Sequence, residues 1–161
     1  MRGRIGFRAE GAGDADIVRA AHVAHRAALF AQAGLSAEAL DRLCRQQHEL
    51  QERHIAVHNP RADRRMIVAG DETVGRLCLD RTAATWRIVD VALLPQAQGR
   101  GVGGAAMRLV LEEAAAAAVG VDLMVGHDNP RAEALYRRLG FVDAIAASAT
   151  HRRLVWSSRP A

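Results

Sequence analysis

The sequence predicts a single domain of mixed α/β class. Its 161 residues have the length of one ordinary domain, and half of them are hydrophobic, which is enough to bury a core and too much for a disordered chain. Segments with strand and helix patterns follow in an irregular order: a strand, two helices, three strands, a helix, a strand, a helix and two strands. This order favours a mixed sheet flanked by helices over a regular alternation of strands and helices.

The N-terminal third is predicted to be mainly helical. A short strand over residues 5–8 ends at two glycines, and Asp14 is a suitable N-cap for a helix that continues to Phe30 with apolar residues at helical spacing. Ser36 is the predicted N-cap of a second helix, whose pattern fades over residues 54–58. Along the chain, two helices are therefore expected between the first strand and the remaining strands.

The remaining two thirds of the chain carry most of the predicted strands. The predicted strands cover residues 65–69, 73–80, 85–94, 121–125, 141–147 and 151–156. A turn at residues 70–72 joins the first two of them as a hairpin. A helix is predicted over residues 105–119 and is expected to end at Gly120, and a last helix begins with Pro130 at its first position, where proline is tolerated.

The charge pattern favours a small anionic partner over a nucleic acid. The net charge is +4, and the chain contains no lysine, so its fixed positive charges are arginines. Arginines suit a polyanionic ligand, but here they are dispersed, without a dense basic run or interleaved aromatic residues, so nucleic acid is not the expected partner. A genome rich in G and C would also produce many Ala and Arg and few Lys without any function.

Two further features bear on the cellular location. The sequence contains no run of 18 apolar residues, so no membrane span is predicted, and residues 1–6 are basic but lack the apolar core of a signal peptide. Cys44 and Cys78 lie far apart in unlike segments, which favours two reduced, buried thiols over a disulfide. We therefore expect a cytoplasmic protein.

The most informative stretch, residues 88–104, is a strand that ends near Pro95, followed by a glycine-rich turn and the start of a long helix. The turn contains Gly99, Gly101, Gly103 and Gly104. Glycines let the backbone approach a ligand closely, and the helix behind them presents free N–H groups and the positive end of its dipole, which favours phosphate. Residues 98–104 are therefore predicted to hold a pyrophosphate.

Two other kinds of phosphate-binding sequence are less compatible with this turn. A Walker-type loop needs a lysine after its glycines, and the chain has none. Gly99, Gly101 and Gly104 match the letters of a dinucleotide fingerprint, but that fingerprint places its glycines directly after the strand and an acid at the end of the next strand. Here residues 95–98 intervene and Asp122 lies at the start of its strand, so a dinucleotide-dependent oxidoreductase is the less favoured alternative.

Two sequence blocks resemble the GNAT superfamily of N-acetyltransferases. The first is Gln98-Gly99-Arg100-Gly101-Val102-Gly103, which is similar to the Arg/Gln-x-x-Gly-x-Gly/Ala motif of that superfamily. The second comprises Asn129-Pro130-Arg131-Ala132, Leu135-Tyr136 and Leu139-Gly140-Phe141. The resemblance covers about residues 65–142. It implies a central, mostly antiparallel sheet of six to seven strands, splayed at the CoA site and flanked by about four helices, with acetyl-CoA as the acetyl donor.

The resemblance also assigns residues to the acetyl-CoA site. The loop amides, namely those of Gly99, Arg100, Gly101, Val102, Gly103 and Gly104, would bind the pyrophosphate, and Gln98 would open the loop. The backbone groups of Val91, Ala92 and Leu93 would bond the pantetheine arm as an added strand would. Asn129 matches a position that bonds the same arm, and it would equally serve as a helix N-cap; the two roles can coexist.

The same resemblance also implies catalytic roles, but it leaves more than one candidate for the base. Tyr136, the only tyrosine, matches a general acid that protonates the departing thiolate, since a phenol near pKa 10 and a thiol near 8.5 are close enough for transfer. Asp90 could take a proton from the acceptor amine through water, hold a cationic acceptor, or simply pair with an arginine. Arg87 stands where some relatives carry a basic carboxylate, which weakens a mechanism with one base. His127 is a second candidate base.

The remaining histidines and arginines allow two interpretations each. His22 and His25 lie one helical turn apart, as do His54 and His58, but no Cys or carboxylate completes a metal ligand set at suitable spacing, so a solvated helix face is favoured and no metal is predicted. Four arginines could meet the 3′-phosphate of CoA or could be surface charge: Arg108, Arg131, Arg137 and Arg138.

Taken together, these observations predict one N-acetyltransferase domain spanning residues 1–161. It would transfer the acetyl group of acetyl-CoA to a small-molecule or peptide amine by direct attack, without an acyl-enzyme, because neither cysteine lies near the two blocks. The alternative is a CoA-binding regulatory domain with little or no turnover. The acceptor is not identified by the sequence, and a homodimer, common among relatives, is possible within this interpretation.

Overall fold

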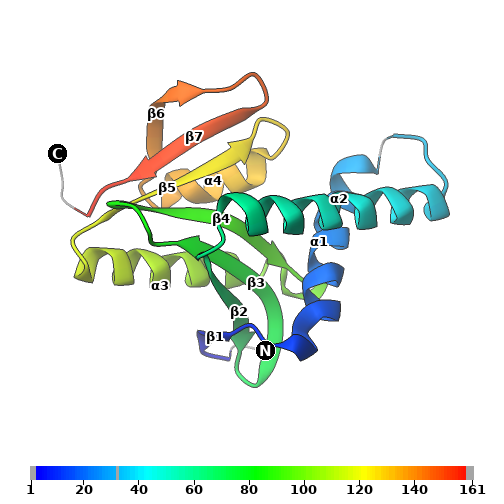
Figure 1. Ribbon diagram of the computed structural model, residues 1–161, viewed down its shortest axis with the longest axis horizontal. Helices are drawn as coiled ribbons and strands as arrows, with labels where there is room; N and C mark the ends of the chain where they lie inside the picture. The colour runs from blue at the N-terminus through cyan, green and yellow to red at the C-terminus, as the bar shows by residue number, and fades with distance from the viewer. Residues whose placement is uncertain (1–2, 32, 159–161) are drawn as a thin grey trace.

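The computed structural model describes residues 3–31 and 33–158 and contains one seven-stranded sheet (Figure 1). The strands are β1 (Ile5–Ala9), β2 (Asp63–Ala69), β3 (Glu72–Asp80), β4 (Thr85–Leu93), β5 (Gly120–Gly126), β6 (Val142–Ala147) and β7 (His151–Trp156). Their order in the sheet is β1-β2-β3-β4-β5-β7-β6, and every neighbouring pair is antiparallel except β4 and β5. The predicted mixed, mostly antiparallel sheet is confirmed.

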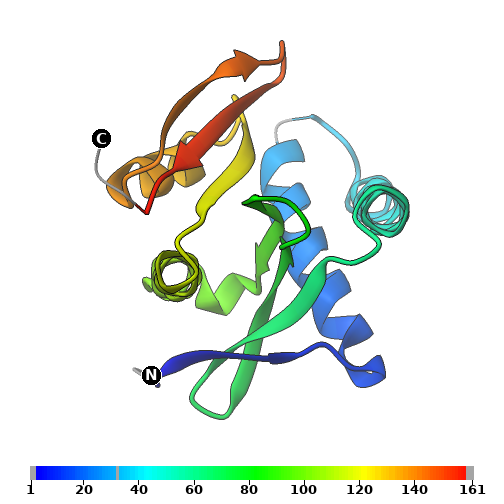
Figure 2. The ribbon, with the colours of Figure 1, turned by 60° about the vertical axis from the view of Figure 1, so that its left-hand side comes forward.

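In the described part of the chain, four helices cover the two faces of the sheet (Figure 2). They are α1 (Ala15–Phe30), α2 (Ala37–His58), α3 (Val102–Ala116) and α4 (Pro130–Arg138), with short 3-10 turns η1 (Ala12–Asp14) and η2 (Pro95–Ala97). Helix α1 packs against α2, β3 and β4, whereas α3 packs against β1 and β5. The helices α1 and α2 therefore lie on one side of the sheet and α3 and α4 on the other.

Local capping chemistry explains two of the four helix starts. The Ser36 hydroxyl accepts a hydrogen bond from Ala39 N at 3.2 Å, and the Asn129 side-chain oxygen accepts one from Ala132 N at 3.1 Å, as expected of N-caps. Asp14 is the N-cap residue of α1 as predicted, but its side chain makes no capping hydrogen bond to the helix. Its carboxylate instead accepts hydrogen bonds from the Arg8 guanidinium and from Gly11 N.

Helix α3 begins three residues earlier and ends three residues earlier than the sequence predicts. Gly103 and Gly104 belong to its first turn and not to the loop, because Gly101, in a left-handed conformation with φ +82°, already directs the chain into the helix. After the helix ends, the chain turns at Ala118, which has φ +55°, and Gly120 is the first residue of β5. Gly120 is therefore not the helix terminator that was predicted.

The main hydrophobic core lies between the sheet and α3. It combines buried side chains from β2 to β5 and β7 with the apolar face of α3, including Ile67, Leu77, Leu79, Ile88, Met107, Val110, Val121, Leu123, Phe141 and Leu154. Cys44 and Cys78 are also buried as free thiols, as predicted. No helix among residues 3–31 and 33–158 is long and apolar enough to cross a membrane.

A β-bulge in β4, in its pairing with β3, lies where the pairing of β4 with β5 ends. Leu79 pairs with Ile88 and the next pair is Cys78 with Asp90, so Val89 is an extra residue on the β4 side. Bulges bend a strand and are frequent beside active sites. The parallel pairing of β4 with β5 also ends at Ile88, opposite Leu123. We call the region beyond this point, Val89–Leu93 of β4 and Met124–Gly126 of β5, the splay.

The first prediction concerns the close approach of β3 and β4 next to the splay. A Cβ atom at Gly75 would lie 2.3 Å from the carbonyl oxygen of Ala92, so the Gly75→Ala variant must push the strands apart and should lose about 1–3 kcal/mol of unfolding free energy. Chemical denaturation measures this loss. The matched variant Gly6→Ala, whose Cβ would meet only Val68 Cγ2 at 3.6 Å, should change stability by about 0.5 kcal/mol or less. Equal stability of the two variants would contradict the prediction.

Candidate active site at the splay

The splay leaves one edge of β4 without a strand partner. Within the described residues, the pairing of β4 with β5 stops at Ile88, while Val91, Ala92 and Leu93 still pair with β3 on their other side. The backbone groups that point toward β5 from this end of β4 are therefore available to a ligand that adds itself as a strand. This geometry agrees with the expected role of Val91, Ala92 and Leu93.

The glycine-rich loop lies directly after this free edge. Gly99 and Gly101 have φ values of +74° and +82°, which L-residues with a side chain rarely adopt. The first backbone hydrogen bond of α3 runs from Ala105 N to Gly101 O at 2.9 Å, so the amides of Val102, Gly103 and Gly104 precede it. The start of α3 therefore offers several N–H groups and the positive end of a helix dipole beside the splay.

Side chains from two other segments support the loop. The Gln98 side-chain amide donates a hydrogen bond to Leu93 O at 3.0 Å, which ties the loop back to the end of β4. Helix α4 lies across the helix start, because Leu135 is within 3.4 Å of a Cβ position at Gly104 and Arg131 Nη2 within 3.0 Å of one at Gly99. The two sequence blocks, separated by about thirty residues, are thus brought together in space.

The loop arginines and Asn129 have different surroundings. Arg131 reaches Gly99 and Arg108 reaches Gly104, so both guanidinium groups lie at the predicted phosphate site, and Arg100 is exposed in the loop. Arg137 instead pairs with Glu133 and Asp143. Asn129 acts as the N-cap of α4 through its side-chain oxygen, which leaves its amide NH₂ to interact with a ligand.

Tyr136 comes from α4 and packs against the core on the α3 side of the sheet. Its ring lies 5.8 Å from that of Phe141, centroid to centroid. Burial, together with the negative charge of Asp90, raises the pKa of Tyr136 to about 12. The phenol therefore stays protonated through the physiological pH range and can act only as a hydrogen-bond or proton donor there.

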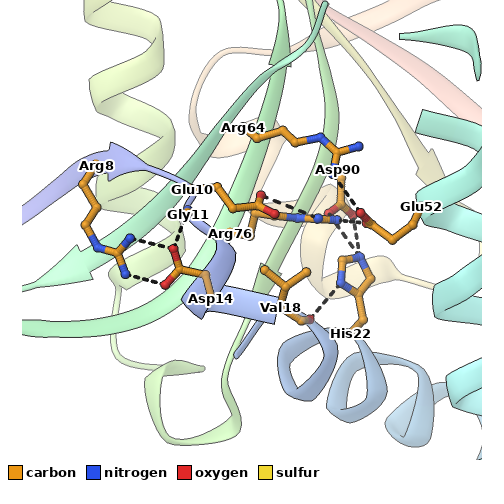
Figure 3. Close-up of polar contacts among 10 residues, drawn as sticks. All are labelled: Arg8, Glu10, Gly11, Asp14, Val18, His22, Glu52, Arg64, Arg76 and Asp90. Carbon is orange, nitrogen blue, oxygen red and sulfur yellow. Dashed lines mark hydrogen bonds and ion pairs between the residues drawn. The ribbon is translucent and has the colours of Figure 1, made fainter. Parts of the chain in front are cut away.

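Asp90 lies on the opposite side of β4, within a buried polar network (Figure 3). One carboxylate oxygen accepts a hydrogen bond from Arg76 Nη2 at 3.0 Å, and both oxygens lie 3.1 Å from His22 Nε2. Burial raises the pKa of Asp90, but the hydrogen bond and charge of His22 and those of Arg76 outweigh burial, so its pKa is lowered overall. Asp90 is consequently an ionised carboxylate and a weak base.

Arg76 is the centre of this network and is completely buried. Its guanidinium pairs with Glu52 of α2 as well as with Asp90, and lies 3.8 Å from Glu10. Arg64 pairs with the second oxygen of Glu52 at 2.9 Å. The network therefore joins α1, α2, β3 and β4 on the face opposite α3, and Figure 3 shows Asp90 between Arg76 and His22.

The expectation that His22 lies on a solvated helix face is wrong. His22 is 4% exposed, with Nδ1 3.1 Å from Val18 O and Nε2 against Asp90. His54 and His58 do lie on an exposed face of α2, as predicted. His127 follows β5 and is exposed, with Nε2 3.4 Å from Ser148 O. Among residues 3–31 and 33–158, no group of three or more His, Cys, Asp or Glu is arranged to hold a metal ion.

Asp122, the acid that a dinucleotide site would need, is paired with two arginines. Asp122 is 2% exposed and accepts hydrogen bonds from the guanidinium groups of Arg87 and Arg153 at 2.5–2.9 Å. It lies in the paired part of β5, opposite Arg87, and not at the splay. The same contact explains why Arg87, on the paired part of β4, does not face the splay.

Fold and site together define an α/β domain with a glycine-rich helix N-terminus at the free edge of a splayed sheet. The family model of the acetyltransferase (GNAT) family matches residues 33–141, more than half of the chain. The chain therefore belongs to the acetyltransferase (GNAT) family, as its two sequence blocks predict.

Solved acetyltransferases share the fold along almost the whole chain. PaiA N-acetyltransferase from Thermoplasma acidophilum, in complex with coenzyme A, is 14% identical with a TM-score of 0.72, covering 95% of this chain and 98% of that one. Spermidine N-acetyltransferase from Vibrio cholerae, in complex with CoA and spermine, is 18% identical with a TM-score of 0.66 and 96% coverage of both chains. Ribosomal-protein-S18-alanine N-acetyltransferase from Escherichia coli is 17% identical with a TM-score of 0.64, covering 98% of this chain and 96% of that one.

Sequence reasoning missed the residues that hold Asp90. Arg76 stands in a strand whose neighbours Val74, Leu77 and Leu79 are all buried, and a charged residue in so apolar a strand indicates a buried ion pair. Its partner Glu52 gave no comparable signal, because α2 carries charged residues along most of its length.

Proposed function

We propose that the protein is an acetyl-CoA-dependent N-acetyltransferase of one domain that transfers the acetyl group directly to an amine. The observation that carries this proposal is the junction of the free edge of β4 with the glycine-rich start of α3, which α4, the helix that carries Tyr136, contacts through Leu135. Family membership supports the same assignment.

Acetyl-CoA binding is assigned to the two sequence blocks. The amides of residues 99–104 hold the pyrophosphate, with Gln98 fixing the loop against Leu93. The free edge of Val91, Ala92 and Leu93, with the amide of Asn129, bonds the pantetheine arm. Arg131 and Arg108 lie where they can pair with the phosphates.

The chemistry at the splay needs one donor and one nucleophile. The lone pair of the unprotonated acceptor amine attacks the thioester carbon, the carbon–sulfur bond breaks, and the electron pair leaves with sulfur. The Tyr136 hydroxyl donates a hydrogen bond to that sulfur as negative charge develops. Asp90, ionised by its contacts with His22 and Arg76, supplies negative charge that attracts a cationic acceptor on the α1 side.

Direct attack is favoured over an acyl-cysteine because neither cysteine is reactive. Burial raises the pKa of Cys78 to about 12 and raises that of Cys44 as well, and a buried thiol of raised pKa is a poor nucleophile. Both side chains are completely buried.

An acceptor screen tests the proposal. Acetyl-CoA is held fixed while spermine, free amino acids, aminoglycosides and peptides with an N-terminal alanine are offered, and thiol release is followed together with the mass of each acceptor. Acetylation of at least one amine supports the enzyme. The alternative, a regulatory CoA-binding domain, predicts that CoA binds with no amine-dependent thiol release, and failure to bind CoA contradicts both.

The acceptor is expected to be a small or peptide amine. One protein of similar fold is in complex with CoA and spermine, and another is a ribosomal-protein-S18-alanine N-acetyltransferase. Both kinds of acceptor are therefore included in the screen, and neither is preferred. A cytoplasmic location and a homodimer stay predictions from the sequence.

The second prediction concerns the loop conformation at Gly101. The Gly101→Ala variant must place an alanine at φ +82°, which costs about 1–2 kcal/mol and should weaken CoA binding about tenfold by moving the loop amides. Calorimetric titration with CoA measures the affinity. The matched variant Gly70→Ala, at φ +64° in the β2–β3 turn, should lose similar stability and bind CoA as the wild type does. Unchanged CoA affinity of Gly101→Ala would contradict the assignment of the loop.

A further inference from the structure

The acceptor amine must lose a proton before it can attack, and Asp90 is poorly suited to take it. An alkyl amine is almost wholly protonated at neutral pH. Asp90 already accepts hydrogen bonds from Arg76 and faces His22, and these positive partners stabilise its ionised form. His22 is equally engaged, since one ring nitrogen meets Val18 O and the other meets Asp90. Neither member of the pair is free to receive a proton.

His25 lies one turn beyond His22 on the same side of α1. Helix α1 packs on β4 and η2, next to the splay, and the His22 side chain of this helix contacts Asp90. His25 is half-buried, and the charges that act on it include Asp90 of β4 and Asp128 of the loop that follows β5. His25 therefore lies on the α1 side of the sheet, one helical turn beyond the contact between His22 and Asp90.

We propose that His25 takes the proton from the acceptor ammonium, directly or through one water molecule. The inference rests on the proposed acetyltransferase function. Among the described residues neither ring nitrogen of His25 has a hydrogen-bond partner, in contrast to His22. Burial, with the positive charges of Arg26 and His22, lowers the pKa of His25, while the carboxylates Asp90 and Asp128 oppose this shift. The ring is thus neutral at pH 7 and has a free lone pair.

The proton balance of the whole reaction is simple. His25 takes one proton from the ammonium, and the amine then attacks the thioester carbon while the Tyr136 hydroxyl donates a hydrogen bond to the departing sulfur. The attacking nitrogen loses its second proton as the amide forms, and water carries this proton to the sulfur. His25 releases its proton to solvent, so one acetyl group is transferred, free CoA leaves as the thiol and one proton is released.

The groups around His25 set the direction of its pH dependence. Arg26 and His22 come from its own helix, Asp90 from β4 and Asp128 from the β5–α4 loop. From α2, His48 packs against His22 with ring centroids 4.8 Å apart, and Cys44 lies near Arg26. Because the base must be unprotonated and its pKa is lowered, kcat/KM should fall only when the pH drops below the ordinary histidine value of about 6.5.

The His25→Gln variant tests the proposal on whichever amine of the screen the wild type acetylates fastest. We expect kcat/KM at pH 7 to fall about a hundredfold, the lower end of the loss typical of a missing general base. CoA affinity and the unfolding temperature should stay close to those of the wild type. His54→Gln, on the exposed face of α2, is the matched control and should retain wild-type kinetics.

Two further measurements separate a proton acceptor from a structural residue. The deficit of His25→Gln should shrink as the pH approaches the pKa of the acceptor, and also for an aromatic amine, which is already unprotonated at pH 7. Added imidazole should restore part of the activity of His25→Ala. If His25→Gln folds and turns over as the wild type does, or if its deficit is the same at every pH, the role of His25 is refuted. If the wild type acetylates no amine in the screen, the proposed function itself fails, and His25 with it.

Discussion

Replacement of Arg76 by Met is expected to lower the free energy of unfolding by about 3–5 kcal/mol, the cost typical of breaking a buried ion pair by removing one partner. Arg76 is completely buried and contacts Glu52 and Asp90 directly, with Glu10 at 3.8 Å. Methionine fills much of the same volume but leaves these carboxylates without their common cation. Denaturant titration at neutral pH measures the loss.

Arg64→Met is the matched control for this variant. Arg64 pairs with the same Glu52, but its side chain is 33% exposed, so its loss should cost about 1 kcal/mol or less. A comparable loss in the two variants would show that burial does not decide the effect and would contradict the argument.

The pH dependence of the Arg76→Met effect follows from the same contacts. Burial raises the pKa of Glu52 and of Asp90, but their positive partners outweigh it and lower both pKa values overall. Carboxylates of lowered pKa contribute stability above their unfolded-state pKa of about 4, and this contribution is lost as the pH falls through the folded-state value. The stability difference between wild type and Arg76→Met should therefore narrow below about pH 4.

This network also shows where sequence reasoning stops. His22 and Asp90 are 68 positions apart, and their contact exists only because α1 crosses β4. The sequence correctly predicts the helical spacing of His22 and His25, but spacing alone does not say which face of a helix is covered. The sequence predicts that Asp90 serves the acceptor or pairs with an arginine, and in the structure Asp90 contacts both Arg76 and His22.

Most of the fold could be predicted because its signals are local. The caps Ser36 and Asn129 and the hairpin turn at residues 70–72 each act within a few residues, so the corresponding elements begin and end close to where they were expected. The predicted start of α3 is too late because glycines are poor helix formers, whereas Gly101, at φ +82°, already directs the chain into the helix before Gly103 and Gly104. The bulge at Val89 has no sequence signal and depends on pairing with β3.

The Tyr136→Phe variant is expected to lower kcat at least tenfold while CoA affinity barely moves. Removal of one hydroxyl leaves the ring packed against Phe141 and removes only the group that donates to the departing sulfur. Steady-state kinetics on an amine from the screen and calorimetric titration with CoA measure the two quantities. Turnover equal to that of the wild type would remove Tyr136 from the mechanism.

The state of the phenol can be measured directly because Tyr136 is the only tyrosine of the chain. The ultraviolet absorbance of phenolate should appear only near pH 12 in the folded protein, since burial and the charge of Asp90 raise the pKa of Tyr136 to about 12. A thiol ordinarily ionises near pKa 8.5, so complete transfer of the proton from this phenol to a free thiolate is unfavourable. Tyr136 therefore assists as a hydrogen-bond donor while the carbon–sulfur bond breaks, and a phenolate signal near pH 10 would instead make it a full proton donor.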